Sequence, residues 1–331
     1  MTDRSIRLHV FCSVKGGVGK STLATVCAKL LCGLGRVPLL IDCDLLGTSL
    51  ADGLELRAPD VTLQTDGSLD LDALPTGRFF SVNETRALRA ARRTAMQTEE
   101  RWRYFPHPPP FVNDVLNHAF GYEHAARVDA LVWKHQREDG VLYLPSSSTY
   151  DDVVESAAWF YGEEFDWARA LLRTLGALPS QIPSLTDVVL DLPTGVWGFP
   201  HEVLDLVSML LEPTKKLPND YPSMGGVRWE PNPFLVTSCD TNDLVPALEY
   251  IARHHDIVPN LKPVVNRRVR APNAVRALAR SRLGSISSLA GIEETIAFVD
   301  HVPTLANVFW EGDVDMAHVP HDLVETLRLG R

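Results

Sequence analysis

Short, almost continuously apolar segments alternate with longer amphipathic segments along most of the chain. The apolar segments are typical of strands covered on both faces, and the amphipathic ones are typical of helices. This alternation predicts an α/β fold with a mostly parallel sheet flanked by helices. The predicted strands are 6–14, 37–42, 140–144, 187–191, 234–237, 261–266 and 297–299. The predicted helices are 20–34, 151–175, 200–211, 242–254, 273–280, 304–310 and 321–329.

The segment from about residue 57 to residue 110 interrupts this alternation. It begins with acidic, turn-rich sequence, continues with an arginine-rich helical segment at 85–103, and ends in three consecutive prolines at 108–110. Consecutive prolines favour an extended polyproline spacer. We therefore predict a single domain over residues 1–331, with an insertion at about 57–110 on the ligand-binding edge of the sheet.

The composition is that of a globular protein with an acidic balance. The 331 residues include 42 Asp or Glu and 32 Lys or Arg, a net charge of −10, and 45% of the residues are apolar. Such a chain can bury a core, and its charge argues against a uniformly basic surface while leaving local basic patches open. No apolar run approaches the ~18 residues of a membrane span. Five cysteines without a C-x-x-C pair are typical of reduced thiols, so we predict a cytoplasmic protein.

A glycine-rich segment at 14–22 lies between the first predicted strand and the first predicted helix. Its sequence is Val-Lys-Gly-Gly-Val-Gly-Lys-Ser-Thr. In that position glycines let successive backbone N–H groups point at a phosphate, and the helix amino terminus adds a positive dipole. Lys20 would reach the β- and γ-phosphates, and the Ser21 hydroxyl would bind Mg²⁺. The ordinary P-loop pattern requires glycine at position 14, but this chain has Val14 followed by Lys15.

Residues 15–22 resemble the deviant Walker A motif of the ParA/MinD family of dimeric ATPases. The resemblance implies a P-loop NTPase fold, ATP and Mg²⁺ as cofactors, and a homodimer that forms when ATP binds. It implies that Lys15 reaches the partner's phosphates and stabilises the transition state, as an arginine finger does in other nucleotidases, while Lys20 acts in its own site. It also implies nucleotide contacts from the rest of the motif: Gly16, Gly17, Val18, Gly19, Lys20, Ser21 and Thr22.

Two aspartate motifs follow in the order that this family has. Residues 39–47 resemble its D-x-D-x-x-G motif at a strand end, although Leu45-Leu46 stands where the family often has Pro-Gln. The resemblance implies that Asp44 orients or activates the attacking water and that Asp42 supports Mg²⁺, and carboxylates suit both tasks. Residues 188–195 resemble the Walker B strand and the second switch loop, which implies that Asp191 also supports Mg²⁺.

Later segments resemble the part of this family that holds the nucleotide base. Asn266 ends a predicted strand, and in the family an asparagine at this point often reads the adenine edge, since a side-chain amide offers both a donor and an acceptor. Arg267 and Pro303 are further predicted nucleotide contacts. The resemblance covers about residues 6–53 and 111–329, and it leaves the insertion without a counterpart.

Two arginine clusters suggest additional partners. The cluster in the insertion consists of Arg86, Arg89, Arg92, Arg93, Arg101 and Arg103. We favour the interpretation that these arginines lie on a solvated helix and pair with Glu84, Glu99 and Glu100. The alternative is that they contact a phosphate backbone. For the later cluster, non-specific DNA stays open as a partner because relatives bind DNA through late basic residues. Its members are Arg267, Arg268, Arg270, Arg276, Arg280 and Arg282.

The predicted function is therefore an Mg²⁺-dependent ATPase switch of the ParA/MinD type. We expect an ATP-dependent homodimer and a protein partner that stimulates hydrolysis or is recruited. We expect no membrane attachment, because the chain ends without a basic amphipathic tail. One alternative is a nucleotide-gated interaction module whose insertion recruits a partner with little turnover. Another is a metal-insertion ATPase, which the missing paired cysteines disfavour, and a small-molecule kinase or synthetase is more distant.

Overall fold

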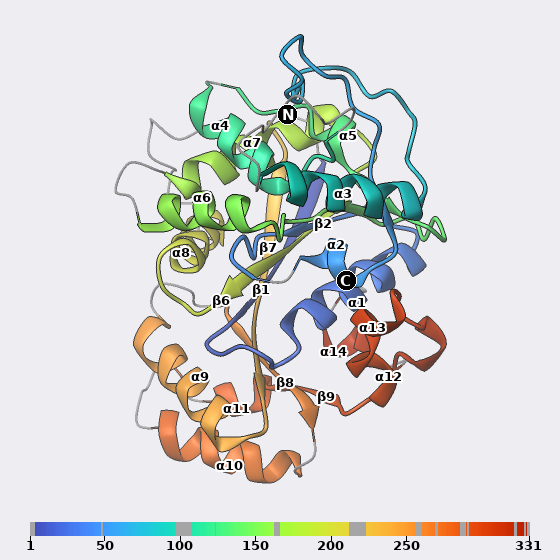
Figure 1. Ribbon diagram of the computed structural model, residues 1–331. Coiled ribbons are helices and arrows are strands. Elements are labelled where there is room, and N and C mark those ends of the chain that lie inside the picture. Colours follow the sequence, from blue (N-terminus) through green and yellow to red (C-terminus); the bar gives the residue numbers. More distant parts are fainter. Residues whose placement is uncertain are drawn as a thin grey trace.

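Nine strands form one sheet in the described part of the chain (Figure 1). They are β1 (Ser5–Ser13), β2 (Pro38–Asp42), β3 (Leu56–Arg57), β4 (Trp133–His135), β5 (Leu142–Leu144), β6 (Asp187–Thr194), β7 (Arg228–Ser238), β8 (Lys262–Arg268) and β9 (Ala297–Asp300). The computed structural model describes residues 4–47, 49–96, 108–122, 124–161, 166–211, 223–255, 260–268, 271–284, 289, 291–320, 323–327 and 329.

The spatial order of the strands is β3-β4-β5-β2-β6-β1-β7-β8-β9. From β5 to β9 in this order every neighbouring pair is parallel. At one edge, β3 pairs with β4 and β4 pairs with β5 in antiparallel fashion. The predicted mostly parallel α/β fold is confirmed. Strands β3 and β4 were not predicted, because two or three residues are too short to show a periodicity.

The helices of the described residues lie on both faces of the sheet. They are α1 (Lys20–Gly33), α2 (Leu50–Gly53), α3 (Val82–Met96), α4 (Val112–Gly121), α5 (Val128–Leu131), α6 (Tyr150–Tyr161), α7 (Trp167–Gln181), α8 (Phe199–Leu211), α9 (Thr241–His254), α10 (Pro272–Leu283), α11 (Ile292–Thr295), α12 (Pro303–Ala306), α13 (Val308–Glu311) and α14 (Leu323–Thr326). Among the residues described, no helix is long and apolar enough to cross a membrane.

Two predicted helices are each divided in the structure. The helix predicted at 151–175 is wrong as one element, since α6 ends at Tyr161 and α7 begins at Trp167. The Asp166 carboxylate accepts a hydrogen bond from the Arg169 backbone N–H at 2.8 Å, which caps α7 and gives it its own start. The helix predicted at 304–310 is divided in the same way into α12 and α13.

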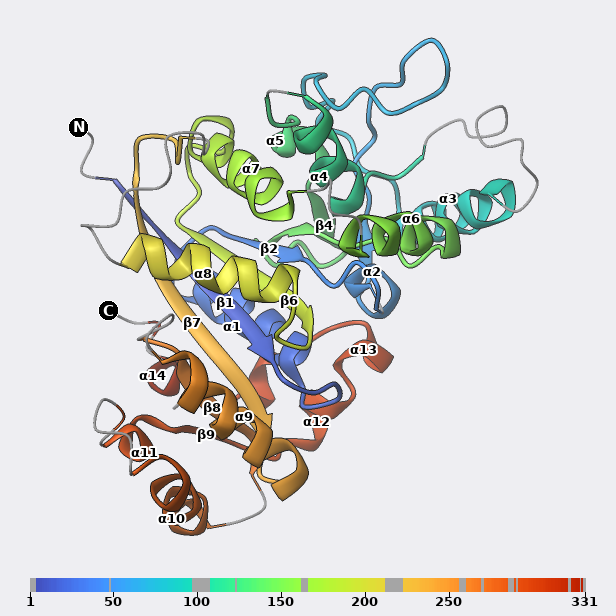
Figure 2. The ribbon, with the colours of Figure 1, turned by 90° about the vertical axis from the view of Figure 1, so that its left-hand side faces the viewer.

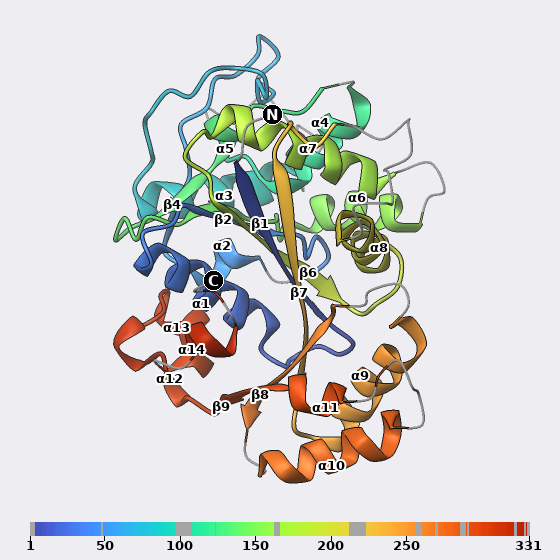
Figure 3. The same cartoon turned by 180° about the vertical axis from the view of Figure 1, so that it is seen from behind.

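The core has two layers, one on each face of the sheet (Figures 2 and 3). Successive residues of β1 alternate between them: Val10 and Cys12 belong to the layer formed with α4, α7, α8 and α9, whereas Phe11 belongs to the layer formed with α1 and α14. This alternation follows from the two-residue period of a strand. It explains why the central strands are apolar on both sides and therefore stand out in the sequence.

The arginine-rich helix α3 is held by ion pairs to other segments. Arg92 is buried, and its guanidinium lies 3.1 Å from Asp152 and 3.4 Å from Asp114. Arg89 and Arg93 both pair with Asp52, at 2.5 and 3.1 Å. The prediction of a solvated helix is therefore wrong for Arg92, because its partners lie far away in the sequence. Four other members of that prediction lie outside the described residues: Glu99, Glu100, Arg101 and Arg103.

Replacing Arg92 should destabilise the fold strongly. An Arg92→Met variant leaves the buried Asp152 and the half-buried Asp114 without their cation, and breaking a buried pair in this way costs about 3–5 kcal/mol. Urea denaturation should show this loss in the free energy of unfolding. The control is Arg86→Met: Arg86 is 62% exposed and lies 3.8 Å from Glu55, so its loss should cost about 0–1 kcal/mol. Equal losses in both variants would contradict the structural role of Arg92.

Candidate functional site

The glycine-rich loop lies between β1 and α1, as predicted. Gly17 and Gly19 have φ angles of 77° and 86°, a left-handed conformation that side chains rarely adopt. A Cβ on Gly19 would also overlap the amide of Asn266. Gly19 precedes the first residue of α1, Lys20, so the loop leads directly into the helix amino terminus. Glycine is therefore required here by both backbone conformation and space.

Two buried carboxylates from neighbouring parallel strands lie next to the start of this helix. Asp42 of β2 and Asp191 of β6 are register partners in the sheet, and each is 1% exposed. The Lys20 ammonium, 5% exposed, forms an ion pair with Asp191 Oδ1. Burial disfavours the charge of Lys20, but Asp191, Asp44 and Asp42 outweigh this and raise its pKa above the ordinary value. The structure thus brings together three of the predicted site residues.

Asp42 is held by hydrogen bonds that orient its carboxylate. It accepts from the Ser146 hydroxyl at 2.8 Å, from the Leu50 N–H at 2.9 Å and from the Asp44 N–H at 3.1 Å. Burial, together with the charge of Asp191, raises the pKa of Asp42 to about 7. Sequence reasoning missed Ser146, because it follows β5 and only the pairing of β5 with β2 brings it close.

Asp44 lies beside this cluster in the loop after β2. Burial raises the pKa of its carboxyl group above the ordinary value, although the charge of Lys20 acts in the opposite direction. Asp44 is less buried than Asp42, so its carboxylate can meet both solvent and a bound molecule. This position suits a group that exchanges a proton with water.

The oxygen atoms of this cluster fit a divalent cation. Asp191 Oδ2 is buried and, among the described residues, has no hydrogen-bond partner. Three carboxylates face one ammonium, so the cluster carries an excess of negative charge when all three are ionised. The Ser21 hydroxyl lies 3.5 Å from the Lys20 ammonium and adds a further oxygen donor. Carboxylate and hydroxyl oxygens are the donors that Mg²⁺ prefers.

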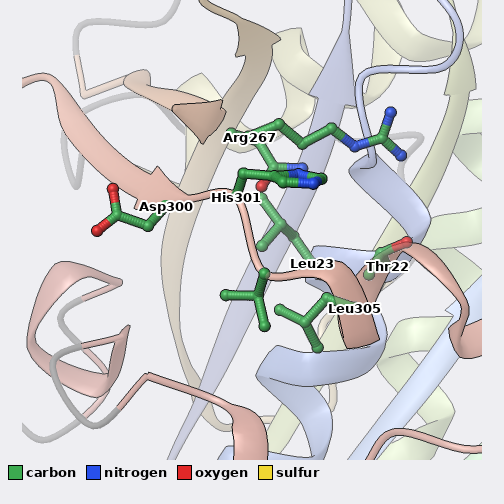
Figure 4. A pocket seen from close by; sticks show the side chains of 8 residues that line it. Thr22, Leu23, Arg267, Asp300, His301 and Leu305 are labelled. Atoms are coloured by element: carbon green, nitrogen blue, oxygen red, sulfur yellow. The ribbon is translucent and has the colours of Figure 1, made fainter. Parts of the chain in front are cut away.

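The predicted base-side residues contact the loop directly. Asn266 Nδ2 donates to the Val18 carbonyl at 2.9 Å, and the Arg267 guanidinium donates to the Gly17 carbonyl at 3.0 Å. Beside them lies a recess (Figure 4) lined by Thr22, Leu23, Asn266, Arg267, Asp300, His301, Val302 and Leu305. Pro303 begins α12 next to Val302 but does not line the recess. Asp300 and His301 were not predicted as contacts, although they directly precede the predicted Val302-Pro303 region of the same segment.

Lys15 and the second switch loop lie at the outer side of the same site. Lys15 is exposed and forms no ion pair with a described residue. The Gly195 N–H donates to the Ser13 carbonyl at 2.9 Å, which ties the switch loop to the end of β1. Gly195 has a φ of 101°, and Trp197, two residues on, is 84% exposed. An exposed cation and an exposed aromatic side chain therefore flank the loop.

The second arginine cluster is partly engaged in ion pairs. Arg280 Nε lies 2.8 Å from Glu293, and Arg276 lies 3.9 Å from Glu294. Arg270 and the side chain of Arg268 lie outside the described residues. Helix α10, which carries part of this cluster, and α3 lie at opposite ends of the molecule (Figures 1 and 2). The two clusters therefore do not form one basic surface.

A glycine loop after the first strand, a helix that begins with lysine, and paired aspartates on two neighbouring parallel strands define the P-loop NTPase class. The chain belongs to the CobQ/CobB/MinD/ParA nucleotide-binding domain family, whose model matches residues 9–306. The ParA/MinD resemblance of the sequence motifs is thereby confirmed. No protein with a curated description is matched by the sequence.

Solved structures of this family are similar in fold. A putative plasmid partition protein from Borrelia burgdorferi B31, bound to AMPPNP, is 10% identical with a TM-score of 0.50, over 98% of this chain and 96% of that one. MinD from Aquifex aeolicus is 16% identical with a TM-score of 0.48, over 98% and 95% of the two chains. MinD from Pyrococcus horikoshii OT3, complexed with Mg-ADP, is 16% identical with a TM-score of 0.48, over 96% and 90%.

Proposed function

We propose that this protein is an Mg²⁺-dependent ATPase that acts as an ATP-dependent homodimer, with the whole chain forming one P-loop unit. The buried ion pair between Lys20 and Asp191 at the mouth of the glycine loop carries the proposal. A lysine and a carboxylate placed in this way can separate when ATP binds together with a metal ion. The Lys20 ammonium would then bind the phosphates of ATP, and the Asp191 carboxylate would bind the cation that accompanies them.

The cation would be held by Ser21, Asp42 and Asp191. When bound, Mg²⁺ neutralises charge that develops on the β- and γ-phosphates. Asp42 is already oriented by Ser146 and Leu50, and Asp191 has one oxygen without a partner in the described part of the chain. The loop N–H groups and Lys20 would bind the phosphates, with contacts from Gly16 to Thr22.

The base would lie in the recess between α1 and the end of β9. Asn266 supports adenine as the base, because its amide can donate and accept on the same edge. In the structure this amide donates to the Val18 carbonyl, so a bound base would compete for it or share it. Arg267 would keep its contact with the Gly17 carbonyl and hold the loop closed on the phosphates.

Asp44 would position the attacking water and Lys15 would act in the partner's site. Asp44 is partly buried, and burial raises the pKa of its carboxyl group above the ordinary value, which makes it a better proton acceptor. Lys15 is exposed and unpaired within the described residues, as a residue must be to reach across an interface. We also propose a protein partner that stimulates hydrolysis or is recruited. Non-specific DNA has less support, because Arg276 and Arg280 pair with Glu294 and Glu293.

Asp44→Asn should separate binding from hydrolysis. The amide keeps the size of the carboxylate but cannot accept a proton, so hydrolysis should fall by about 10²–10⁴-fold. ATP affinity should change little, because Asp44 is not one of the proposed phosphate or Mg²⁺ ligands. Phosphate release and nucleotide titration measure the two effects, with the exposed Asp66→Asn as a control. Normal hydrolysis by Asp44→Asn would show that its proposed role is wrong.

Lys15→Ala should abolish the nucleotide-dependent dimer. Without this cation, less positive charge would compensate the negative charge of the two sets of phosphates across the interface. Gel filtration with AMPPNP, with ADP and without nucleotide should show a larger species only for the wild type with AMPPNP. Lys134→Ala, on strand β4 between β3 and β5, is the control and should behave like the wild type. A wild-type protein of unchanged size with AMPPNP would contradict the dimer proposal.

A further inference from the structure

Three potential metal ligands from three separate segments meet away from the nucleotide site. Asp72 belongs to the 57–110 insertion, His118 to α4, and His124 to the loop after α4. Asp72 Oδ1 lies 3.0 Å from His124 Nε2 and 3.4 Å from His118 Nε2. One ligand atom from each residue lies within 4.8 Å of the other two.

His118 is the residue that points to a missing ligand. Its side chain is 7% exposed, and its Nε2 atom is buried without a hydrogen bond from any described residue. A buried ring nitrogen without a partner costs free energy, and a metal ion would remove that cost.

Aromatic packing fixes the directions of the two imidazoles. The His118 ring stacks on Tyr122, with centroids 4.5 Å apart and planes at 28°. The His124 ring stands edge-on to His118, with centroids 5.1 Å apart and planes at 81°. Packed rings lose little further freedom when a ligand binds, so this arrangement is prepared for metal binding.

A second group of similar composition, His135, Asp139 and Asp313, shows what a satisfied cluster looks like. Lys29 forms ion pairs with both of its aspartates, at 2.6 and 2.5 Å. Both nitrogens of His135 are engaged: Nδ1 accepts from the Arg137 N–H at 3.2 Å, and Nε2 then donates to the Gly312 carbonyl at 3.1 Å. A lysine already supplies the positive charge there, whereas Asp72, His118 and His124 have no such cation in the described residues.

We propose that Asp72, His118 and His124 bind one Zn²⁺ ion that fastens the insertion to α4. Two imidazoles and one carboxylate suit a transition metal rather than Mg²⁺. Ligands at about 2.0–2.1 Å around a tetrahedral Zn²⁺ are about 3.3 Å from one another, close to the 3.0 and 3.4 Å that separate Asp72 from the two histidines. Water completes the fourth position on the exposed side of Asp72. The site does not depend on the proposed ATPase function.

Metal binding by nucleotide-free, untagged protein tests this proposal. Excess Mg²⁺ occupies the carboxylates near the glycine loop during the titration. Co²⁺, added as a visible probe and then displaced by Zn²⁺, should bind the wild type with one equivalent and show the absorption of a tetrahedral site. His124→Gln and Asp72→Asn should each weaken binding by more than about 100-fold, because losing only the supporting partner of a ligand costs 10–100-fold.

His318→Gln is the matched control for these variants. His318 and Asp315 form an exposed pair at 2.7 Å, and their exposures of 59% and 50% match the 58% and 52% of His124 and Asp72. His318→Gln should therefore bind the metal like the wild type. No tetrahedral Co²⁺ spectrum in the wild type would overturn the proposal, and so would equal affinities in all four proteins. Both test variants change exposed residues, so failure to fold is not expected to obscure the result.

Discussion

The buried ion pair between Lys20 and Asp191 is the interaction on which the site depends. Asp191 and Asp42 are register partners on two parallel strands, which places two carboxylates side by side away from water. Hydrogen bonds compensate Asp42 there, and Lys20, the first residue of α1, supplies the cation that compensates Asp191. A shift of either strand or of the loop would leave a charge buried and unpaired. The sheet register and the loop conformation are therefore linked by this electrostatic requirement.

The surrounding contacts make this arrangement rigid on one side and adaptable on the other. Asp42 is oriented by Ser146 and Leu50, and the loop is held by Asn266 and Arg267. In contrast, Lys20 has a flexible side chain, and Asp191 keeps one oxygen without a partner among the described residues. In the proposed function, a phosphate and a cation would replace this ion pair. This is how the resting structure and the proposed nucleotide-bound state are related.

Much of the fold and of this site could be predicted from the sequence. The central strands and the glycine loop have strong local patterns, and the family motifs identify Lys20, Asp42 and Asp191. Contacts between distant segments could not be predicted. The local sequence predicts that Arg92 is solvated, but in the structure it pairs with Asp152, which lies 60 residues away in the sequence. In the same way, Asp72 and His124 are 52 residues apart, so neither carries a metal-binding spacing. Both failures concern the insertion and its neighbours, for which no motif was available.

The affinity for ATP with and without Mg²⁺, measured in the wild type and in Asp191→Asn, tests the central claim most directly. Asparagine keeps the shape of the side chain, and Asp42 and Asp44 remain to compensate Lys20. We expect the wild type to bind ATP much more tightly with Mg²⁺ than without it, and we expect Asp191→Asn to lose most of this difference. An equal effect of Mg²⁺ on both proteins, or no ATP binding by the wild type, would contradict the account.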